Sequence, residues 1–298
     1  MKSLRTLLNG LIDYAGLFPP AKLDMASAVK NYAKYTASGR SWALGRFIVP
    51  MSRLAEFELA TDVLPATGQP QPWRLSVLGG SDIESEKDEI VHFNIRHADH
   101  ESRPIIIDTV ELKASSASAV ELAARMHGND VSLFLEIPIT DDPSGLISAI
   151  RQSGAKAKVR TGGVTADAFP SNKDLARFIH ACAKERVMFK ATAGLHHPIH
   201  SEYSLTYEKE SPKGIMHGFI NVFLAAAFAH NGMGPTEIER LLLEQDPTAF
   251  VFTDENVSWR ENMLSVYQVN AARAGLALAF GSCSFTEPFD DLRTLGFL

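Results

Sequence analysis

Lysine and arginine side chains recur at alternate positions in two short segments that otherwise have the composition of β-strands. Residues 157–161 carry Lys158 and Arg160, and residues 188–192 carry Lys190. Side chains alternate across a strand, so Lys158 and Arg160 share one face and their apolar neighbours the other. A lysine in a dry pocket beside a second cation has a lowered pKa, and its neutral amine can attack a carbonyl carbon to form a Schiff base.

Other predicted strands repeat this division into a charged face and a mostly apolar face. The charged faces carry, in chain order, Arg46, Arg74, Glu111, Lys113, Glu136, Lys158, Arg160 and Lys190. In residues 105–113, Asp108 is predicted on the opposite, outer face with Val110 and Leu112. The apolar faces suit an outer layer of helices, which leaves the charged faces to share one enclosed space.

The charges in that space do not balance, because six are cations and two are anions. A buried charge without a partner costs several kcal/mol or shifts its pKa. The sequence therefore predicts that the space binds a small anionic ligand, a carboxylate or a phosphate. A purely structural network of ion pairs is the alternative, although clusters of perturbed charges favour functional sites.

The segments that position these residues alternate between strand and helix patterns. We predict strands at residues 12–15, 44–49, 73–78, 105–113, 133–137, 157–161, 188–192 and 276–283. Helical periodicity marks residues 4–11, 25–36, 52–61, 85–93, 117–126, 145–152, 175–183, 216–229, 235–244 and 261–274. Eight such units in 298 residues predict a TIM (β/α)8 barrel, with residues 1–298 as a single α/β domain. No predicted strand runs into the spaced-glycine dinucleotide fingerprint, which disfavours an open doubly wound sheet.

Composition excludes several classes of function. The net charge is −6 and there is no basic run, so we expect no nucleic-acid partner. The most apolar run, residues 218–229, is shorter than a membrane span, so we expect no membrane partner. Two cysteines are too few for a disulfide framework, and no signal peptide is recognisable, which together predict a cytoplasmic protein.

The lysine segments also carry a resemblance. Lys190 opens the run Lys-Ala-Thr-Ala-Gly, and Lys158 opens the run Lys-Val-Arg-Thr-Gly-Gly. Over about a dozen residues these runs resemble the paired lysine strands of class I aldolases of the deoxyribose-phosphate aldolase type. There a Lys-Thr-Ser-Thr-Gly strand holds the Schiff-base lysine, and a second lysine strand ending in Gly-Gly follows.

The resemblance implies that Lys190 forms the imine and that Lys158 is its electrostatic partner. Two features depart from the family pattern: the strand order is reversed, and Arg160 stands between lysine and glycines. In such chemistry Glu136 or Glu111 would transfer protons. A lysine that only binds an oxyanion is the alternative.

Three histidines follow the second lysine strand. His196, His197 and His200 open a connection of about twenty residues, and a connection that long in a compact domain is typical of function. We expect His196 or His197 to act as a general acid or base without a cofactor. Alternatively all three, with Glu136, hold a divalent metal such as zinc. Pro198 argues against a helix that would align His196 with His200.

Glycines end the last three predicted strands, where barrels often bind a phosphate through backbone N–H groups. The predicted anion-binding set there is Thr161, Gly162, Gly163, Thr192, Gly194, Gly281, Ser282 and Cys283. Ordinary tight turns are the alternative. Cys283 is expected to be a small buried residue, since the sequence places no His or Asp beside it. Asp13, at the end of the first strand, is expected either to reach the mouth of the barrel or to cap a turn.

The helix predicted at residues 216–229 is apolar almost all round. Such a helix is buried under another layer or against a second subunit, so a homo-oligomer is possible. Together these features predict an enzyme with aldolase- or lyase-type chemistry on a small anionic carbonyl compound. A metal-dependent lyase or hydrolase and a non-catalytic anion-binding barrel are the two alternatives.

Overall fold

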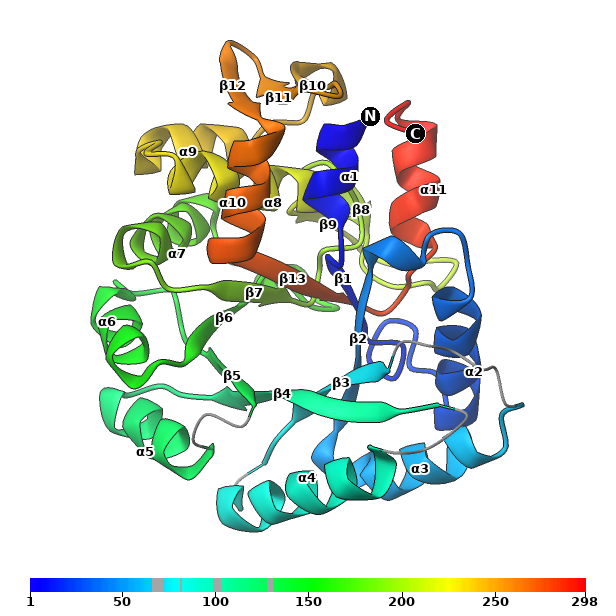
Figure 1. Cartoon of the computed structure of the whole chain (residues 1–298). Helices are drawn as coiled ribbons and strands as arrows, with labels where there is room; N and C mark the ends of the chain where they lie inside the picture. Colours follow the sequence, from blue (N-terminus) through cyan, green and yellow to red (C-terminus); the bar gives the residue numbers. More distant parts are fainter. Residues whose placement is uncertain (66–71, 81, 99–102, 128–130) are drawn as a thin grey trace.

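Eight parallel strands close into a barrel in the computed structural model of this protein (Figure 1). The structure describes residues 1–65, 72–80, 82–98, 103–127 and 131–298. The barrel strands are β1 (Ile12–Tyr14), β2 (Leu44–Pro50), β3 (Trp73–Leu78), β4 (Ile105–Lys113), β5 (Ser132–Glu136), β6 (Lys156–Arg160), β7 (Phe189–Thr192) and β13 (Ala277–Ser282). The ring closes where β13 pairs with β1, so the predicted TIM barrel is confirmed.

Helices surround the barrel and bury their apolar residues against the strands and against one another. They are α1 (Lys2–Leu8), α2 (Met25–Thr36), α3 (Leu54–Asp62), α4 (Ile83–His97), α5 (Ala117–His127), α6 (Ser144–Ser153), α7 (Asn172–Glu185), α8 (Phe219–His230), α9 (Pro235–Leu242), α10 (Val266–Gly275) and α11 (Glu287–Thr294). Helix α7 is typical. It buries Leu175, Phe178 and Cys182, which lie on one face, and the side chain of Ser171 caps its N-terminus. None of the described helices is long and apolar enough to cross a membrane.

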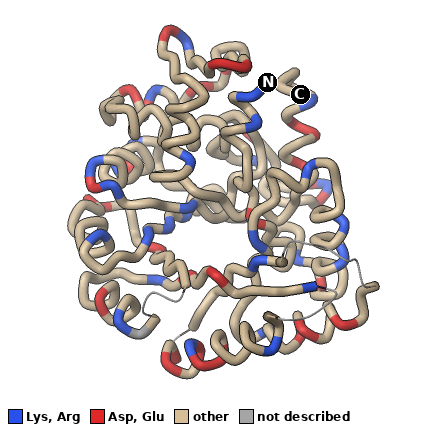
Figure 2. Tube along the Cα trace, viewed as in Figure 1, with Lys and Arg blue, Asp and Glu red and all other residues tan. Residues whose placement is uncertain are grey.

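The register of neighbouring strands places four charged residues in one row. Lys113 pairs with Glu136, Glu136 with Lys158, and Lys158 with Lys190. Residues paired in this way point to the same face of a sheet. Charged residues accordingly occur on the inner strands as well as on the outer helices (Figure 2).

Two additional sheets lie outside the barrel, and neither was predicted. The connection after β7 contains the antiparallel hairpin of β8 (Ser201–Ser204) and β9 (Lys213–Met216). Residues 250–265 form a three-stranded sheet of β10 (Phe250–Phe252), β11 (Asn256–Trp259) and β12 (Asn262–Ser265). The helix predicted at residues 261–274 therefore begins only at α10. Ser265 and Gln268 form a capping box at that point, which starts the helix and ends the strand.

The apolar helix predicted at residues 216–229 is α8, and it is buried within this one chain. Every residue from Phe219 to Ala229 is buried. The helix packs against β13 on the barrel side and against α7, α9 and α10 around it. Its amide residue Asn221 donates to the backbone oxygens of Leu241 and Glu244. An intramolecular second layer thus accounts for the lack of a polar face.

Candidate active site at the barrel mouth

Lys158 lies at the centre of a chain of ion pairs inside the barrel. Its Nζ is 2.8 Å from Oε2 of Glu111 and 2.8 Å from Oε2 of Glu136. The other oxygen of Glu136 accepts a hydrogen bond of 3.1 Å from Nε of Arg160. Burial raises the pKa of Glu136, but Lys158 and Arg160 outweigh it, so that the pKa is lowered and the carboxylate stays ionised.

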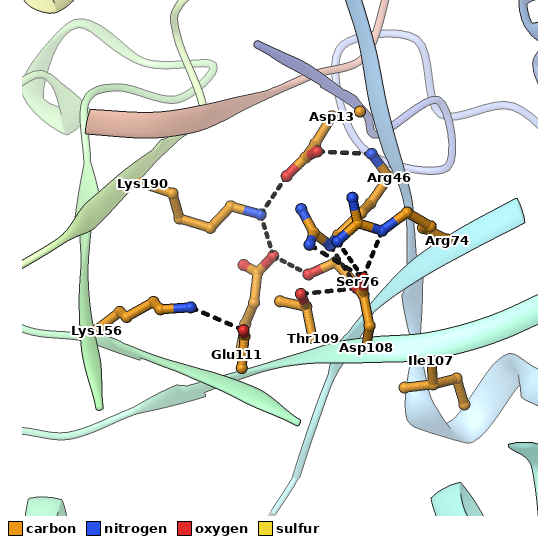
Figure 3. A network of polar contacts seen from close by, with 12 residues as sticks. Asp13, Arg46, Arg74, Ser76, Ile107, Asp108, Thr109, Glu111, Lys156 and Lys190 are labelled. Carbon is orange, nitrogen blue, oxygen red and sulfur yellow. Dashed lines mark hydrogen bonds and ion pairs between the residues drawn. The ribbon is translucent and has the colours of Figure 1, made fainter. Parts of the chain in front are cut away.

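Lys190 is held more tightly and lies deeper. Its Nζ is 2.6 Å from Oδ2 of Asp13 and 2.6 Å from Oε1 of Glu111, which also accepts from Ser76 Oγ (Figure 3). Its side chain is 1% exposed. Burial lowers the pKa of this amine, but Asp13 and Glu111 outweigh burial and the pKa is raised. Lys190 is therefore an ammonium ion that neutralises two buried carboxylates.

Asp13 is buried in the barrel interior and is not among the described residues of the cavity at the mouth, so it takes neither of its two expected places. Its Oδ1 accepts a hydrogen bond from the backbone N–H of Arg46 at 2.7 Å. A Cβ at Gly45 would collide with Oδ1 of Asp13, so glycine is needed for this approach of β1 to β2. Its neighbour Tyr14 is also buried, so this segment is part of the core rather than a capped turn.

The side chains of Arg46 and Arg74 form a cluster with Asp108 toward the N-terminal ends of the strands, and the backbone N–H of Arg46 links this cluster to Asp13. Both donate to Asp108, Arg46 at 2.5 Å to Oδ1 and Arg74 at 2.5 Å to Oδ2 (Figure 3). The prediction that Asp108 faces outward was wrong. The β3–β4 register shifts at this point, so that Asp108 is an extra residue in a β-bulge and its carboxylate turns inward.

A cavity of about 690 Å³ opens at the carboxyl ends of the barrel strands, where enzymes of this fold have their active sites. The predicted site residues in its wall are Glu111, Lys113, Glu136, Lys158, Arg160, Gly163, Thr192, His196, Gly281 and Cys283. The predicted site residues that are not among the described lining residues are Arg46, Arg74, Thr161, Gly162, Lys190, Gly194, His197, His200 and Ser282. The wall thus carries the cations Lys113, Lys158 and Arg160.

The predicted glycine and hydroxyl residues outside the wall are engaged in packing. Thr161 Oγ1 donates to the backbone oxygen of Ala193 at 2.6 Å. Gly194 has φ = 74°, a left-handed conformation that suits glycine, and a Cβ at Gly162 or Gly194 would strike the ring of Phe169. These residues shape the loops behind the cavity.

The histidines predicted as a general acid or base, or as metal ligands, lie in different surroundings. His196 lines the cavity, and burial, followed by the nearby His197, lowers its pKa to about 4, so its imidazole is neutral at pH 7. His197 Nδ1 lies 2.6 Å from Oδ2 of Asp291, and its ring stacks on Tyr203. His200 is buried next to His217. No group of three or more His, Cys, Asp or Glu residues in the described part of the chain could hold a metal ion.

The fold also places His196 beside Cys283, which the sequence alone did not indicate. The Nδ1 atom of His196 is 3.8 Å from the thiol sulfur, and Tyr207 Oη is 3.5 Å from the same sulfur. Burial raises the pKa of Cys283, so its thiol stays protonated. Tyr207 comes from the β8–β9 hairpin, which sequence periodicity did not reveal.

Fold and site together define a TIM-barrel protein with a charged cavity at the carboxyl ends of its strands. No protein-family model, curated protein or solved structure matches this chain.

Proposed function

We propose that the barrel mouth is the active site of an enzyme that cleaves or forms a carbon–carbon bond in a small anionic carbonyl compound. The single observation that supports this proposal best is the position of Lys158. Its amine stands in the wall of the cavity between two carboxylates, two residues from Arg160 on the same face of β6. A lysine amine that opens into a cavity, with a carboxylate within reach to take its proton, can form an imine with a bound carbonyl compound.

Lys158 is a better candidate for the imine than Lys190, to which the resemblance assigns that role. Lys190 is 1% exposed and bound by Asp13 and Glu111, and it is not among the described residues of the cavity wall. Lys158 reaches the cavity, and Lys190 then acts as a positioning residue that fixes Glu111. Exchanging the two roles keeps the predicted chemistry and changes only the lysine that carries it.

Binding of the substrate would itself free the carboxylate of Glu136 to act as a base. The anionic group of the substrate binds the guanidinium of Arg160, and Lys113 provides a second cation. The substrate thereby competes with Glu136 for the hydrogen bond from Arg160. Glu136 loses one stabilising partner and accepts a proton from Lys158. The neutral amine attacks the carbonyl carbon, and the carbonyl oxygen leaves as water. His196, which is neutral and faces the same cavity, then moves the proton that accompanies carbon–carbon cleavage.

Borohydride trapping tests the proposal. Pyruvate, a small anionic ketone, should leave a stable adduct on the protein because borohydride adds hydride to the imine carbon and makes the bond permanent. Intact mass spectrometry detects the adduct, and peptide mapping should place it on Lys158. Lys158→Arg keeps the charge between Glu111 and Glu136 but should abolish the adduct.

Lys156→Met is the matched control. Lys156 lies on the same face of the same strand, but its Nζ binds Ser132 Oγ below the site, so trapping should be unchanged. An adduct on Lys190 would restore the assignment that the resemblance implies. Binding of pyruvate without an adduct or turnover would favour a non-catalytic barrel, and activity lost to a chelator would favour a metal-dependent enzyme. We further propose a cytoplasmic setting, where Cys182 and Cys283 would stay as free thiols.

A further inference from the structure

A second cavity adjoins the first at the barrel mouth. It has a volume of about 570 Å³ and lies between the ends of β4–β6 and residues 167–174. Lys113, Glu136 and Arg160 line both cavities, so these three side chains form the partition between them. The Arg160 side chain is 49% exposed. A ligand bound to Arg160 can therefore extend to either side.

The wall of the second cavity combines an apolar floor with exposed polar side chains that are available to a ligand. Pro138 and Phe169 contribute to the floor. Ser115, Thr140 and Asp167 line the same space, and none of their side chains makes a hydrogen bond or ion pair with another described residue. These three side chains are exposed, so a purely apolar ligand would displace the water around them without replacing its hydrogen bonds, whereas a ligand with hydroxyl groups could replace them. The wall suits a ligand with hydroxyl groups.

The charge of this wall argues against a second anionic group on the ligand. Glu136, Asp167 and Asp174 contribute carboxylates, and Lys113 and Arg160 are the cations among the described lining residues. Glu136 and Asp174 are already paired with Arg160 and Arg177. Asp167 therefore remains as a negative charge away from the partition, where it would repel a phosphate or carboxylate.

We propose that the substrate spans both cavities and is an α-oxo acid with an uncharged, hydroxylated chain. This inference rests on the proposed function. The carboxylate binds Arg160 and Lys113 at the partition, and the carbonyl carbon meets Lys158 in the first cavity. The hydroxylated chain, which is bonded to the carbonyl carbon, turns past the carboxylate at the partition and occupies the second cavity. Lys158 and Arg160 both contact the one carboxylate of Glu136, so the substrate's carbonyl and carboxylate must be close together, as they are in an α-oxo acid.

Three probe compounds and one substitution that narrows the second cavity test this assignment of the substrate. The probes are pyruvate and two six-carbon α-oxo acids, one with an alkyl chain and one with a hydroxylated chain. Borohydride trapping at Lys158 and calorimetric titration are both measured for each probe. The hydroxylated acid should half-saturate the protein at a concentration at least tenfold below that of pyruvate, and the alkyl acid should show no such advantage. Thr140→Trp, which fills the second cavity, should remove the advantage, so that the hydroxylated acid and pyruvate half-saturate this variant at similar concentrations.

Gln245→Trp is the matched control, since Gln245 is exposed after α9 and should leave all three probes unchanged. Equal half-saturation by pyruvate and the hydroxylated acid, or an unaltered preference in Thr140→Trp, would overturn the second subsite. Preference for the alkyl acid would overturn the hydroxylated chain. If calorimetry shows the preference and its loss in Thr140→Trp while no probe is trapped, the subsite stands and the imine function fails. If no probe binds at all, both fail.

Discussion

At the scale of single residues, Glu111 is the group on which the interior charges depend. Its two oxygens hold two different lysines, Lys190 through Oε1 and Lys158 through Oε2. Burial raises the pKa of Glu111, but the two lysines outweigh burial and lower it well below its ordinary range. The carboxylate is therefore ionised at any ordinary pH. It holds Lys190 in a structural ion pair, while Lys158 still faces the cavity.

The stability of the fold should depend on pH through His196. Burial lowers its pKa from 6.5 to about 4, so the unfolded chain binds its proton at a higher pH than the folded chain does. The stabilisation from a neutral His196 is complete above pH 6.5 and is lost as the pH falls from there through 4. At about 1.4 kcal/mol per pKa unit, the total loss is at most about 3 kcal/mol. His196→Phe should lose correspondingly less stability on acidification. Urea unfolding at neutral and mildly acidic pH measures both proteins, and identical pH profiles would contradict the prediction.

At the scale of elements, the bulge in β4 separates two polar clusters that one strand would otherwise merge. Thr109 and Glu111 follow the ordinary alternation, but the extra residue Asp108 turns inward below them. Strand parity, which rests on an unbroken period of two, fails wherever a bulge inserts a residue. The result is a structural ion-pair cluster with Arg46 and Arg74 toward the N-terminal ends and a charged cavity at the carboxyl ends.

Asp108→Asn should therefore lower stability without weakening anion binding. The substitution removes the charge that Arg46 and Arg74 share, and we expect a loss of about 2 kcal/mol in the free energy of unfolding. Half-saturation by pyruvate should not change, because neither arginine is among the described residues of the cavity wall. Asp141→Asn, an exposed site, is the control and should stay within about 0.5 kcal/mol. Weaker pyruvate binding in Asp108→Asn would place the arginines in the binding site.

At the scale of the whole molecule, the side of the barrel at β13 carries a second layer. Helix α8 is covered by α7, α9 and α10, and the three-stranded sheet packs against α1 and α10 beside it (Figure 1). The carboxylate of Glu244 ties this layer together, accepting from Trp259 Nε1 at 3.1 Å and from Arg260 Nε at 2.7 Å. The apolar surface of α8 is thereby covered within the chain, so self-association, if it occurs, would have to use another surface.

Phe223→Ala should show whether α8 is buried within one chain or between copies of the chain. Phe223 is 1% exposed and its ring lies 5.8 Å from that of Phe280 on β13. Truncation should cost about 3–5 kcal/mol. Because the contact is intramolecular, the urea midpoints of the native protein and the variant should not depend on protein concentration. Val251→Ala, at an exposed position of β10, is the control with little expected effect. A midpoint that rises with protein concentration would indicate an interface between copies of the chain.

Local patterns in the sequence determined the barrel and the inward direction of most of its charges. Periods of two and 3.6 residues and the turns between them depend on neighbours along the chain, so strand alternation alone assigns Lys158, Arg160, Lys190 and Glu136 to the inner face. Only the tertiary structure decided which lysine reaches the cavity. Lys190 meets Asp13 across 177 positions of sequence, and such a pairing depends on distances between strands that no local pattern encodes. The same reason applies to the diverging histidines and to the partition that divides the mouth into two cavities.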